Sequence, residues 1–319
     1  DLLSALQPDL VVFSNTEPFS NLEAKEITRT CKIPFIIVEG LVESAPTLNQ
    51  AQYLDYLQNH YSYSKAVILV SEHNLDLLQK CYRLPNHKGQ IIHYGRPQSY
   101  FIAVKPQKRQ NLRSQVNIPQ DAIVCFTAAR IEPRKGYQYQ LQAIEKLLNS
   151  PVWDRLYFVW AGSGIFAPEM EQHIKQHLKN LNIEHKVILL GQIPSVVDWL
   201  DVADIFILPS QAEGMPLSIM EAMAKGLAVI ATEVSGIPEE LGSTGQLLPD
   251  PNHDPSATVQ SLVETLQDWA ENPTKIETIG AACRERALAM FQEERMVKES
   301  LAVIEKALES SKNFVTVPH

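Results

Sequence analysis

The stretch that most constrains the fold is DIFILPSQAEGMPLSIMEAMAKGLAVIAT, residues 204–232. A short apolar run stands at each end, and between them lies a segment that Pro216 opens and Gly226 ends. Continuous apolar runs bounded by turn residues are typical of strands that are buried on both faces. We therefore predict a buried strand at residues 205–208, a loop, a helix that opens at Pro216 and stops at Gly226, and a second buried strand.

The start of this helix has the character of a binding site. Proline suits a first helical turn, because its missing N–H would have no partner there. The free amides of Met215, Leu217 and Ser218 would point out of the helix end, where the helix dipole favours an anion. Two carboxylates flank it, Glu213 in the preceding loop and Glu221 about two turns further in. Carboxylates accept hydrogen bonds from hydroxyls, so the pattern predicts a site for a sugar joined to a phosphate.

Size and charge narrow the class of protein. The 319 residues allow two domains, and 45% apolar and 20% charged residues are ordinary for a globular chain. A net charge of -9 argues against a general nucleic-acid binder. Four scattered cysteines without a CxxC pair favour free thiols in a reducing compartment. No apolar run approaches the ~20 residues of a membrane span, so we expect a cytoplasmic protein and leave peripheral membrane attachment open.

Strands and helices alternate in two successive series. The first series has predicted strands at residues 8–15, 33–40 and 66–72, and the second restarts at residues 123–128, 156–162 and 187–191. Such alternation predicts parallel sheets covered on both faces. We expect one domain over residues 1–104, a second over 105–290, and a C-terminal helix over 291–319 that returns to the first domain. The basic run KPQKRQ at residues 105–110 is predicted to be a solvated linker.

Two further loops of the second series carry candidate ligands. Arg130 and Lys135 follow the strand at 123–128, at the end of a parallel sheet where ligands bind. Together they could grip a diphosphate, although an ordinary charged loop is the alternative, since Arg134 stands there too. Gly162 and Gly164 form an AGSG turn that would let a ligand approach the backbone. The turn lacks the full GxGxxG pattern, which disfavours a nicotinamide dinucleotide site.

Five segments between Thr127 and Leu248 carry a resemblance to a known family. They read AARIEPRKG, WAGSG, ILLGQIP, the stretch at 204–232, and SGIPEELGSTGQLL. In order and spacing they resemble the nucleotide-sugar half of the retaining glycosyltransferases of family 4, the group 1 glycosyltransferases. The resemblance implies an α/β protein of GT-B type, with two Rossmann-like parallel-sheet domains that face a cleft.

The resemblance also implies roles for single residues. Those matching Arg130 and Lys135 hold the donor diphosphate, the one matching Glu213 contacts the transferred sugar, and the one matching Glu221 binds the ribose. The segment from Gly191 through Gln192 to Ile193 would line the base through its backbone. The donor site as a whole would be completed by Gly162, Gly164, Gly214, Met215, Pro216, Leu217 and Ser218.

The implied activity is transfer of a sugar from a nucleoside-diphosphate sugar to a hydroxyl, with retention of configuration. The acceptor could be a saccharide, a lipid-linked compound or a small molecule. The chain has no DxD motif, and we expect neither a metal nor another cofactor. A nucleotide-sugar-binding protein without transferase activity and a GT-B-fold epimerase remain the alternatives.

The first hundred residues depart from the family in three places. The opening strand and glycine-rich loop of the family are not in this chain, so we expect an incomplete N-terminal domain. The sequence HYGR, which ends at Arg96, stands where Asn-Gly plus an apolar residue is usual. Val38, Glu39 and Gly40 stand where a histidine is often found; Glu39 is either a replacement for its polar contact or a satisfied strand-end carboxylate.

Overall fold

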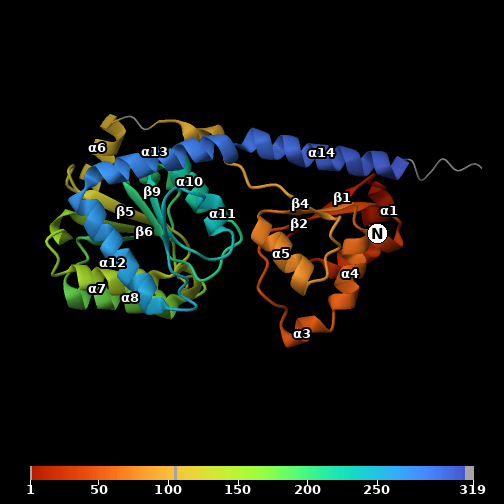
Figure 1. Cartoon of the computed structure of the whole chain (residues 1–319), viewed down its shortest axis with the longest axis horizontal. Coiled ribbons are helices and arrows are strands. Elements are labelled where there is room, and N and C mark those ends of the chain that lie inside the picture. Colours follow the sequence, from red (N-terminus) through yellow and green to blue (C-terminus); the bar gives the residue numbers. More distant parts are fainter. Residues whose placement is uncertain (1, 104–105, 313–319) are drawn as a thin grey trace, which may run out of the picture. The chain divides into compact units, whose positions relative to one another are not determined.

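The computed structural model describes residues 2–103 and 106–312, which fold into two compact units. Unit 1 contains the chain up to Gly95 and the C-terminal helix that begins at Glu293, and unit 2 runs from Arg96 to Gln292. Each unit has a parallel β-sheet with helices packed against it (Figure 1). The prediction of an α/β protein with two parallel sheets is therefore confirmed.

Unit 1 is built on a four-stranded sheet with the order β1-β2-β3-β4. The strands are β1 (Val11–Asn15), β2 (Phe35–Glu39), β3 (Ala66–Leu69) and β4 (Gly89–Ile91). The helices are α1 (Leu2–Leu6), α2 (Leu22–Thr30), α3 (Leu48–Ala51), α4 (Leu54–Tyr63), α5 (Glu72–Cys81) and α14 (Glu293–Lys312).

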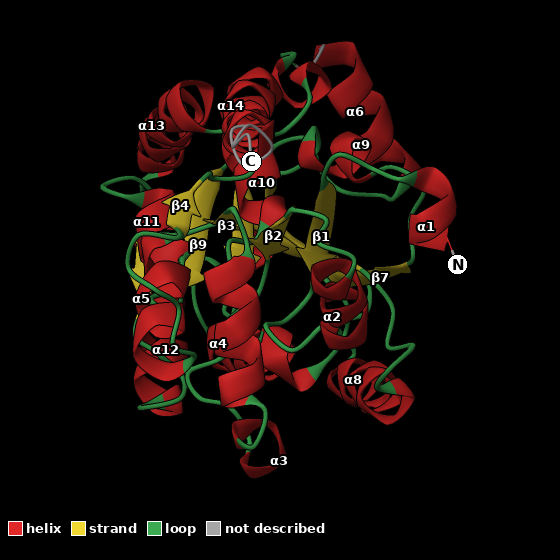
Figure 2. Ribbon diagram, turned by 90° about the vertical axis from the view of Figure 1, so that its right-hand side faces the viewer, coloured by secondary structure: helices red, strands yellow, loops and turns green. Residues whose placement is uncertain are grey.

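The two faces of this sheet have separate cores. Successive strand side chains point to opposite faces, so Phe35 and Ile37 of β2 pack with Leu57 of α4, whereas Ile36 packs with Val303 of α14. Figure 2 shows the strands in their order, with α14 on one side and α2 and α4 on the other. Both faces are covered, which is why β2 and β3 consist of nearly continuous apolar residues.

Unit 2 is built on a six-stranded parallel sheet with the order β10-β9-β8-β5-β6-β7. Its strands are β5 (Ile123–Ala128), β6 (Leu156–Ala161), β7 (Val187–Gly191), β8 (Ile205–Leu208), β9 (Ala228–Thr232) and β10 (Gln246–Leu248). Counted from β5, this is the doubly wound order in which the direction of winding reverses between the first and fourth strands. The reversal places a crevice beyond the carboxyl ends of β5 and β8.

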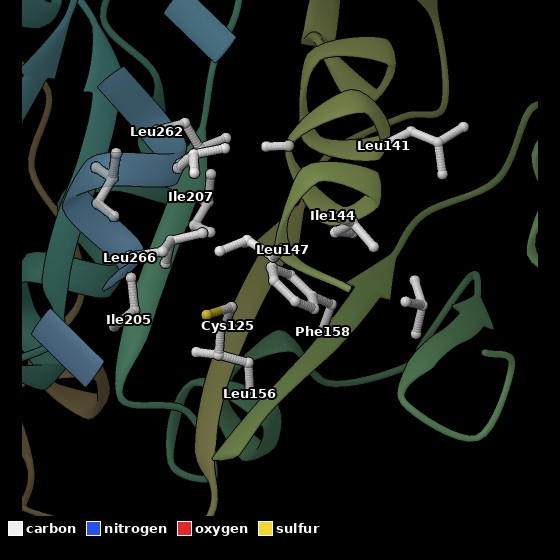
Figure 3. Packing of buried hydrophobic residues seen from close by; sticks show 14 of the residues in the cluster. Cys125, Leu141, Ile144, Leu147, Leu156, Phe158, Ile205, Ile207, Leu262 and Leu266 are labelled. Carbon is white, nitrogen blue, oxygen red and sulfur yellow. The ribbon is translucent and has the colours of Figure 1, made fainter. Parts of the chain in front are cut away.

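The helices of unit 2 cover both faces of this sheet. They are α6 (Pro106–Gln115), α7 (Tyr137–Leu147), α8 (Pro168–Leu181), α9 (Val196–Leu200), α10 (Leu217–Lys225), α11 (Ile237–Leu241), α12 (Pro255–Glu271) and α13 (Pro273–Met290), with short 3-10 segments η1 (Gln98–Phe101), η2 (Pro133–Lys135) and η3 (Trp153–Arg155). Figure 3 shows side chains from α7, α12 and the strands meeting in one cluster, among them Leu147, Leu266, Cys125, Phe158 and Ile207. Within the described residues, no helix combines the length and apolar character that crossing a membrane requires.

The basic run at 105–110 is predicted to be a solvated linker; in its described part residues 106–108 and 110 are exposed, but the run is a helix rather than a linker. Residues from Pro106 onward form the helix α6. Lys108 pairs with Asp198 at 2.5 Å, and Arg109 pairs with Asp204 at 2.5 Å. The run finds acidic partners on a segment some ninety residues later, which a local charge pattern does not reveal. Lys105 lies outside the described residues.

Candidate functional site

The loops after β5 and β8 meet at the point where the sheet reverses its winding. The Gln211 amide donates to the Arg134 carbonyl over 2.8 Å, which joins the two loops through their backbones. Gly136 has φ +76°, and a Cβ there would lie 1.9 Å from the Pro209 carbonyl oxygen. Only glycine allows this close approach without strain. The loops of residues 129–136 and 209–216 therefore lie together at the carboxyl end of the sheet, where sheets of this order have their ligand crevice.

Glu213 is the best-partnered carboxylate in this crevice. Its Oε1 lies 2.5 Å from Lys135 Nζ and accepts a hydrogen bond from Ser210 Oγ over 2.8 Å. Its Oε2 lies 3.5 Å from Arg134 Nη1. The Lys135 and Glu213 side chains are only 14% and 7% exposed, so water screens their attraction less than it would at the surface. The described residues include no group of three or more His, Cys, Asp or Glu side chains arranged to hold a metal ion.

The loop after β9 makes hydrogen bonds with the backbone at Glu213 and Gly214. Ser235, in the left-handed region with φ 52°, accepts a hydrogen bond from the Glu213 amide at Oγ over 3.2 Å. The Gly236 amide donates to the Gly214 carbonyl over 3.1 Å. Three strand-end loops thus fix the backbone around Glu213, and its carboxylate is held in place before any ligand arrives.

The predicted anion site lies directly after Glu213. Helix α10 begins at Leu217, one residue later than predicted, because Pro216 has the extended angles φ -71° and ψ 114°. The first amides of a helix have no partner within it, and those of Leu217 and Ser218 stand at this end. Gly214, Met215 and Pro216 are buried, whereas Leu217 is 39% exposed. The structure brings these residues together with Lys135 and Glu213.

Arg130 has different neighbours from Lys135. Its side chain is 52% exposed, lies 3.3 Å from Glu132, and places its guanidinium 5.3 Å from the centre of the Phe166 ring. Arg134, which in the sequence only supported the alternative of an ordinary charged loop, is the arginine that contacts Glu213. Arg134 also donates to the Ala212 carbonyl over 2.6 Å. The position of Arg134 in the sequence, next to Lys135 and two residues after Glu132, was the signal that could have marked it as a site residue.

The glycine turn after β6 packs against the loop that carries Arg130. Gly162 has φ +145°, and a Cβ there would lie 1.8 Å from the Ala129 carbonyl oxygen. The Gly164 amide donates to Glu171 Oε2 over 2.5 Å, so this amide already has a protein partner. Hydrogen bonds from Lys175 and from this amide lower the pKa of Glu171. The glycines therefore shape the rim of the crevice through the backbone.

The predicted base-lining segment adjoins this turn. The Gly162 amide donates to the Gly191 carbonyl over 2.8 Å, and Gly191 has φ +66°. Gln192 is exposed and Ile193 is half-buried. These residues follow β7, the edge strand of the sheet, so they lie on the β6 side of the crevice.

Glu221 points to a partner that the sequence did not indicate. It stands on α10, and its Oε1 lies 2.5 Å from Arg96 Nη2. Burial raises the pKa of Glu221, while the charge of Arg96 and a hydrogen bond from Tyr100 oppose the rise. The structure therefore places Glu221 on the same helix as the anion site, with its own cation.

A second carboxyl near Glu213 was also missed. Glu240 on α11 is 0% exposed, and its carboxyl oxygens have no side-chain hydrogen-bond partner among the described residues. Burial raises the pKa of Glu240 well above its usual range, and the nearby Glu213 carboxylate adds to the rise. The apolar neighbours Ile237 and Leu241, both 0% exposed, mark this as the buried face of the helix and were the signal in the sequence.

In unit 1 the ends of β1 and β2 carry a closed polar cluster. Glu39 Oε1 accepts hydrogen bonds from Asn15 Nδ2 over 3.1 Å and from the Tyr61 hydroxyl over 3.0 Å, and the residue is 0% exposed. Burial raises the pKa of Glu39. Lys25 is also 0% exposed and donates to the Ser20 carbonyl over 2.7 Å, and burial lowers its pKa to about 8. Glu39 is thus a buried carboxyl whose Oε1 has two donors, whereas its Oε2 has no hydrogen-bond partner among the described residues.

Comparison with known proteins finds a family model that matches part of unit 2. Residues 121–268 match the family model described as Glycosyl transferases group 1. These residues are similar to the group 1 glycosyltransferases, and the match covers less than half of the chain. The matched residues include Lys135, Glu213 and α10.

Curated relatives extend the similarity beyond these residues. D-inositol 3-phosphate glycosyltransferase of Streptomyces coelicolor is 29% identical over 247 residues, which is 75% of this chain and 50% of the relative. The putative teichuronic acid biosynthesis glycosyltransferase TuaC of Bacillus subtilis is 27% identical over 265 residues, 82% of this chain and 61% of TuaC. The chain spans about half the length of the first of these relatives.

Solved structures are similar in fold to this chain. A glycosyltransferase from Rickettsia africae has a TM-score of 0.81 at 20% identity, with 96% of this chain and 79% of that one covered. Anabaena Alr3699/HepE in complex with UDP has a TM-score of 0.78 at 17% identity, covering 99% and 81%. The predicted GT-B fold is therefore confirmed, whereas the roles of single site residues stay predictions.

Proposed function

We propose that this protein transfers a sugar from a nucleoside-diphosphate sugar to the hydroxyl of an acceptor, with retention of the anomeric configuration. The observation that carries the proposal is the Lys135–Glu213 pair, 2.5 Å apart beside the first amides of α10. A cation and a helix end suit a diphosphate, and a carboxylate beside them suits hydroxyls. A donor that joins a diphosphate to a sugar satisfies both.

In the proposed reaction, charge develops on the diphosphate as its bond to the anomeric carbon breaks. The acceptor oxygen forms the new bond to that carbon on the same face, and its proton is released. Fixed donors aimed at developing charge are usually the largest catalytic contribution. Lys135, Arg130 and the amides of Leu217 and Ser218 would supply them. We propose that these groups act without a bound metal, and we assign no covalent nucleophile.

Glu213 has the capacity to orient the sugar. Its Oε1 is engaged by Lys135 and Ser210, while its Oε2 has only the 3.5 Å contact with Arg134. A carboxylate oxygen offers about two acceptor positions, so Oε2 is the atom we assign to the sugar hydroxyls. Glu221 would accept from the ribose, and the backbone at Gln192 and Ile193 would line the base.

Related proteins suggest which donor to test first. Solved structures of Anabaena Alr3699/HepE are described with UDP and with UDP-glucose, and Streptomyces relatives are named D-inositol 3-phosphate glycosyltransferase. We therefore propose a UDP-sugar as the first candidate donor. We describe the acceptor only as a hydroxyl compound.

The test is a thermal-shift screen of the whole chain against UDP-, GDP- and ADP-sugars, followed by transfer assays with and without EDTA. A ligand at about 100 times its Kd should add about 2.7 kcal/mol of stability. We expect one nucleotide class to stabilise unit 2, and we expect EDTA to leave transfer unchanged. Binding without transfer would leave a nucleotide-sugar-binding protein, and conversion of the donor without an acceptor would indicate an epimerase. No stabilisation by any donor would overturn the proposal.

A further inference from the structure

Among the described residues, Arg96 forms an ion pair with Glu221. Arg96 Nη2 lies 2.5 Å from Glu221 Oε1, and the two side chains are 19% and 11% exposed. The hydroxyl of Tyr100 also hydrogen-bonds to Glu221. A carboxylate removed from water in this way needs such partners to stay ionised. The pair therefore sets the charge and the orientation of Glu221.

Arg96 is itself held in place from several sides. Its amide donates to the Phe291 carbonyl over 2.8 Å, and its backbone forms a parallel bridge with Gln292. Its guanidinium lies 4.6 Å from the centre of the Tyr100 ring, on η1. Since η1 packs on α10, Arg96 and Tyr100 reach Glu221 from a fixed segment. The side chain of Arg96 is not a free surface arginine that pairs by chance.

We propose that Arg96 and Tyr100 are positioning residues, which hold Glu221 ionised and oriented to accept the hydroxyls of the donor ribose. The inference rests on the proposed function, in which Glu221 is the ribose acceptor. A carboxylate has about four acceptor positions, and Arg96 and Tyr100 occupy two of them. The remaining two suffice for the two hydroxyls of a ribose.

The chemistry predicts a specific loss when Arg96 is removed. A buried carboxylate without its cation takes up a proton more readily, because burial disfavours the charged form. A protonated carboxyl accepts fewer hydrogen bonds from hydroxyls, so the contact with the ribose weakens. Contacts with the diphosphate, made by other residues, do not depend on this pair. The effect should therefore fall on ligands that carry ribose hydroxyls.

The experiment compares ribonucleotides with analogues that lack both hydroxyls. Affinities of UDP, GDP and ADP and of their 2′,3′-dideoxy counterparts are measured by calorimetry for the full chain and for Arg96→Leu. The full chain should prefer the ribonucleotide by about tenfold or more, as expected for hydrogen bonds to a charged group. Arg96→Leu should weaken the ribonucleotide about tenfold and the dideoxy form less than about twofold. Arg96→Lys should restore part of the preference.

Two further variants guard against a loss of folding. Tyr100→Phe removes only a hydroxyl, and it should cost the ribonucleotide about threefold while sparing the dideoxy form. Arg109→Leu removes a comparable pair, Arg109–Asp204 at 2.5 Å. This pair lies just before β8, whereas the loop that carries Glu213 follows β8. Arg109→Leu should leave the preference for ribose unchanged. Thermal unfolding of each variant verifies that the fold persists.

Three outcomes would count against the inference. Equal weakening of both ligand classes in Arg96→Leu would reduce Arg96 to a structural role. Tighter binding of the ribonucleotide in that variant would show that Arg96 competes with the ribose. If the unaltered chain binds none of the three nucleoside diphosphates, the proposed function fails and this inference fails with it.

Discussion

The two sheets each have a carboxylate at a strand end, and the two carboxylates differ in their hydrogen-bond and charge partners. In unit 2, Glu213 has Lys135 at 2.5 Å and lies beside the open end of α10. In unit 1, Glu39 accepts from two neutral donors, Asn15 and Tyr61, and burial raises its pKa. The first arrangement matches charge with charge, whereas in the second the effect of burial exceeds that of the Lys25 charge and disfavours the ionised form. A parallel sheet alone therefore does not make a site for an anionic ligand; the loops must also supply cations.

The largest expected effect comes from neutralising the two carboxylates in turn. Glu213→Gln should lower transfer by more than about 10²-fold, because the carboxylate is proposed to hold the reacting sugar. Binding of the free nucleoside diphosphate should change by less than about threefold. The matched variant Glu39→Gln should leave transfer within about threefold. Steady-state kinetics measures transfer, and calorimetry measures nucleotide binding. Comparable losses of transfer activity in the two variants would contradict the different roles assigned to Glu213 and Glu39.

A somewhat smaller effect is expected from the cations of unit 2. Lys135→Met should lower transfer about 10- to 10²-fold, because Arg134 still lies near Glu213. Lys25→Met, in unit 1, should leave nucleotide affinity unchanged. Initial rates and Kd values for both variants decide the matter, and a loss of affinity in Lys25→Met would contradict the assignment of the donor to unit 2.

The same assay ranks the two arginines of this loop. Arg130→Ala should cost about 10²-fold in transfer if Arg130 grips the diphosphate. Arg134→Ala should cost less, since its contacts are with Ala212, Glu132 and Glu213 of the protein itself. If the order of the losses is reversed, the diphosphate contact belongs to Arg134.

Acid should weaken unit 1 through a buried histidine. His60 is 0% exposed, and burial, followed by the charge of Lys25, lowers its pKa to about 4. A folded-state pKa below the unfolded one gives stability that is present above about pH 6.5 and lost as the pH falls toward about 4. His60→Phe should reduce this acid loss by about 1–2 kcal/mol. Thermal unfolding across that pH window tests it, with the exposed His253→Gln as control; an unchanged acid slope in His60→Phe would rule the mechanism out.

The smallest expected effect concerns the desolvated carboxyl of unit 2. The pKa of Glu240 is raised, so its neutral form is favoured in the folded state. Its contribution to stability is present below the unfolded pKa and is lost as the pH rises toward the folded one. Glu240→Gln should therefore stabilise unit 2 by about 1 kcal/mol at about pH 8 and by less at about pH 5. Glu239→Gln, on the same helix, is the control, and a gain that does not depend on pH would point to another cause.

The elements themselves were predictable because their signals are local. The apolar run at residues 123–128 gave the bounds of β5, and residues 205–208 gave those of β8. The strand predicted at residues 66–72 is too long, because β3 ends at Leu69 and Ser71 begins the next helix by accepting a hydrogen bond from the Asn74 amide. Each of these signals needs only a few neighbouring residues. The candidate residues Lys135 and Glu213 could likewise be picked out, because each follows a predicted strand.

The partners of the candidate residues could not be predicted in the same way. Arg96 and Glu221 are far apart in the chain, and their pairing depends on how η1 packs against α10. The acidic partners of α6 lie some ninety residues away. Ile237 and Leu241 mark the buried face of α11, but the nearness of Glu240 to Glu213 follows only from the position of that helix. Long-range pairing and desolvation are properties of packing, so they appear only when the elements are assembled.

The sequence by itself determined the βα alternation, the strand-end positions of Lys135 and Glu213, and the helix start that follows them, because hydrophobic period and turn residues act over a few positions. Only the tertiary structure decided which cation meets which carboxylate and which carboxyl is cut off from water. The reason is that electrostatic energies depend on distance and solvent exposure, and both are set by the order of the strands and the packing of the loops.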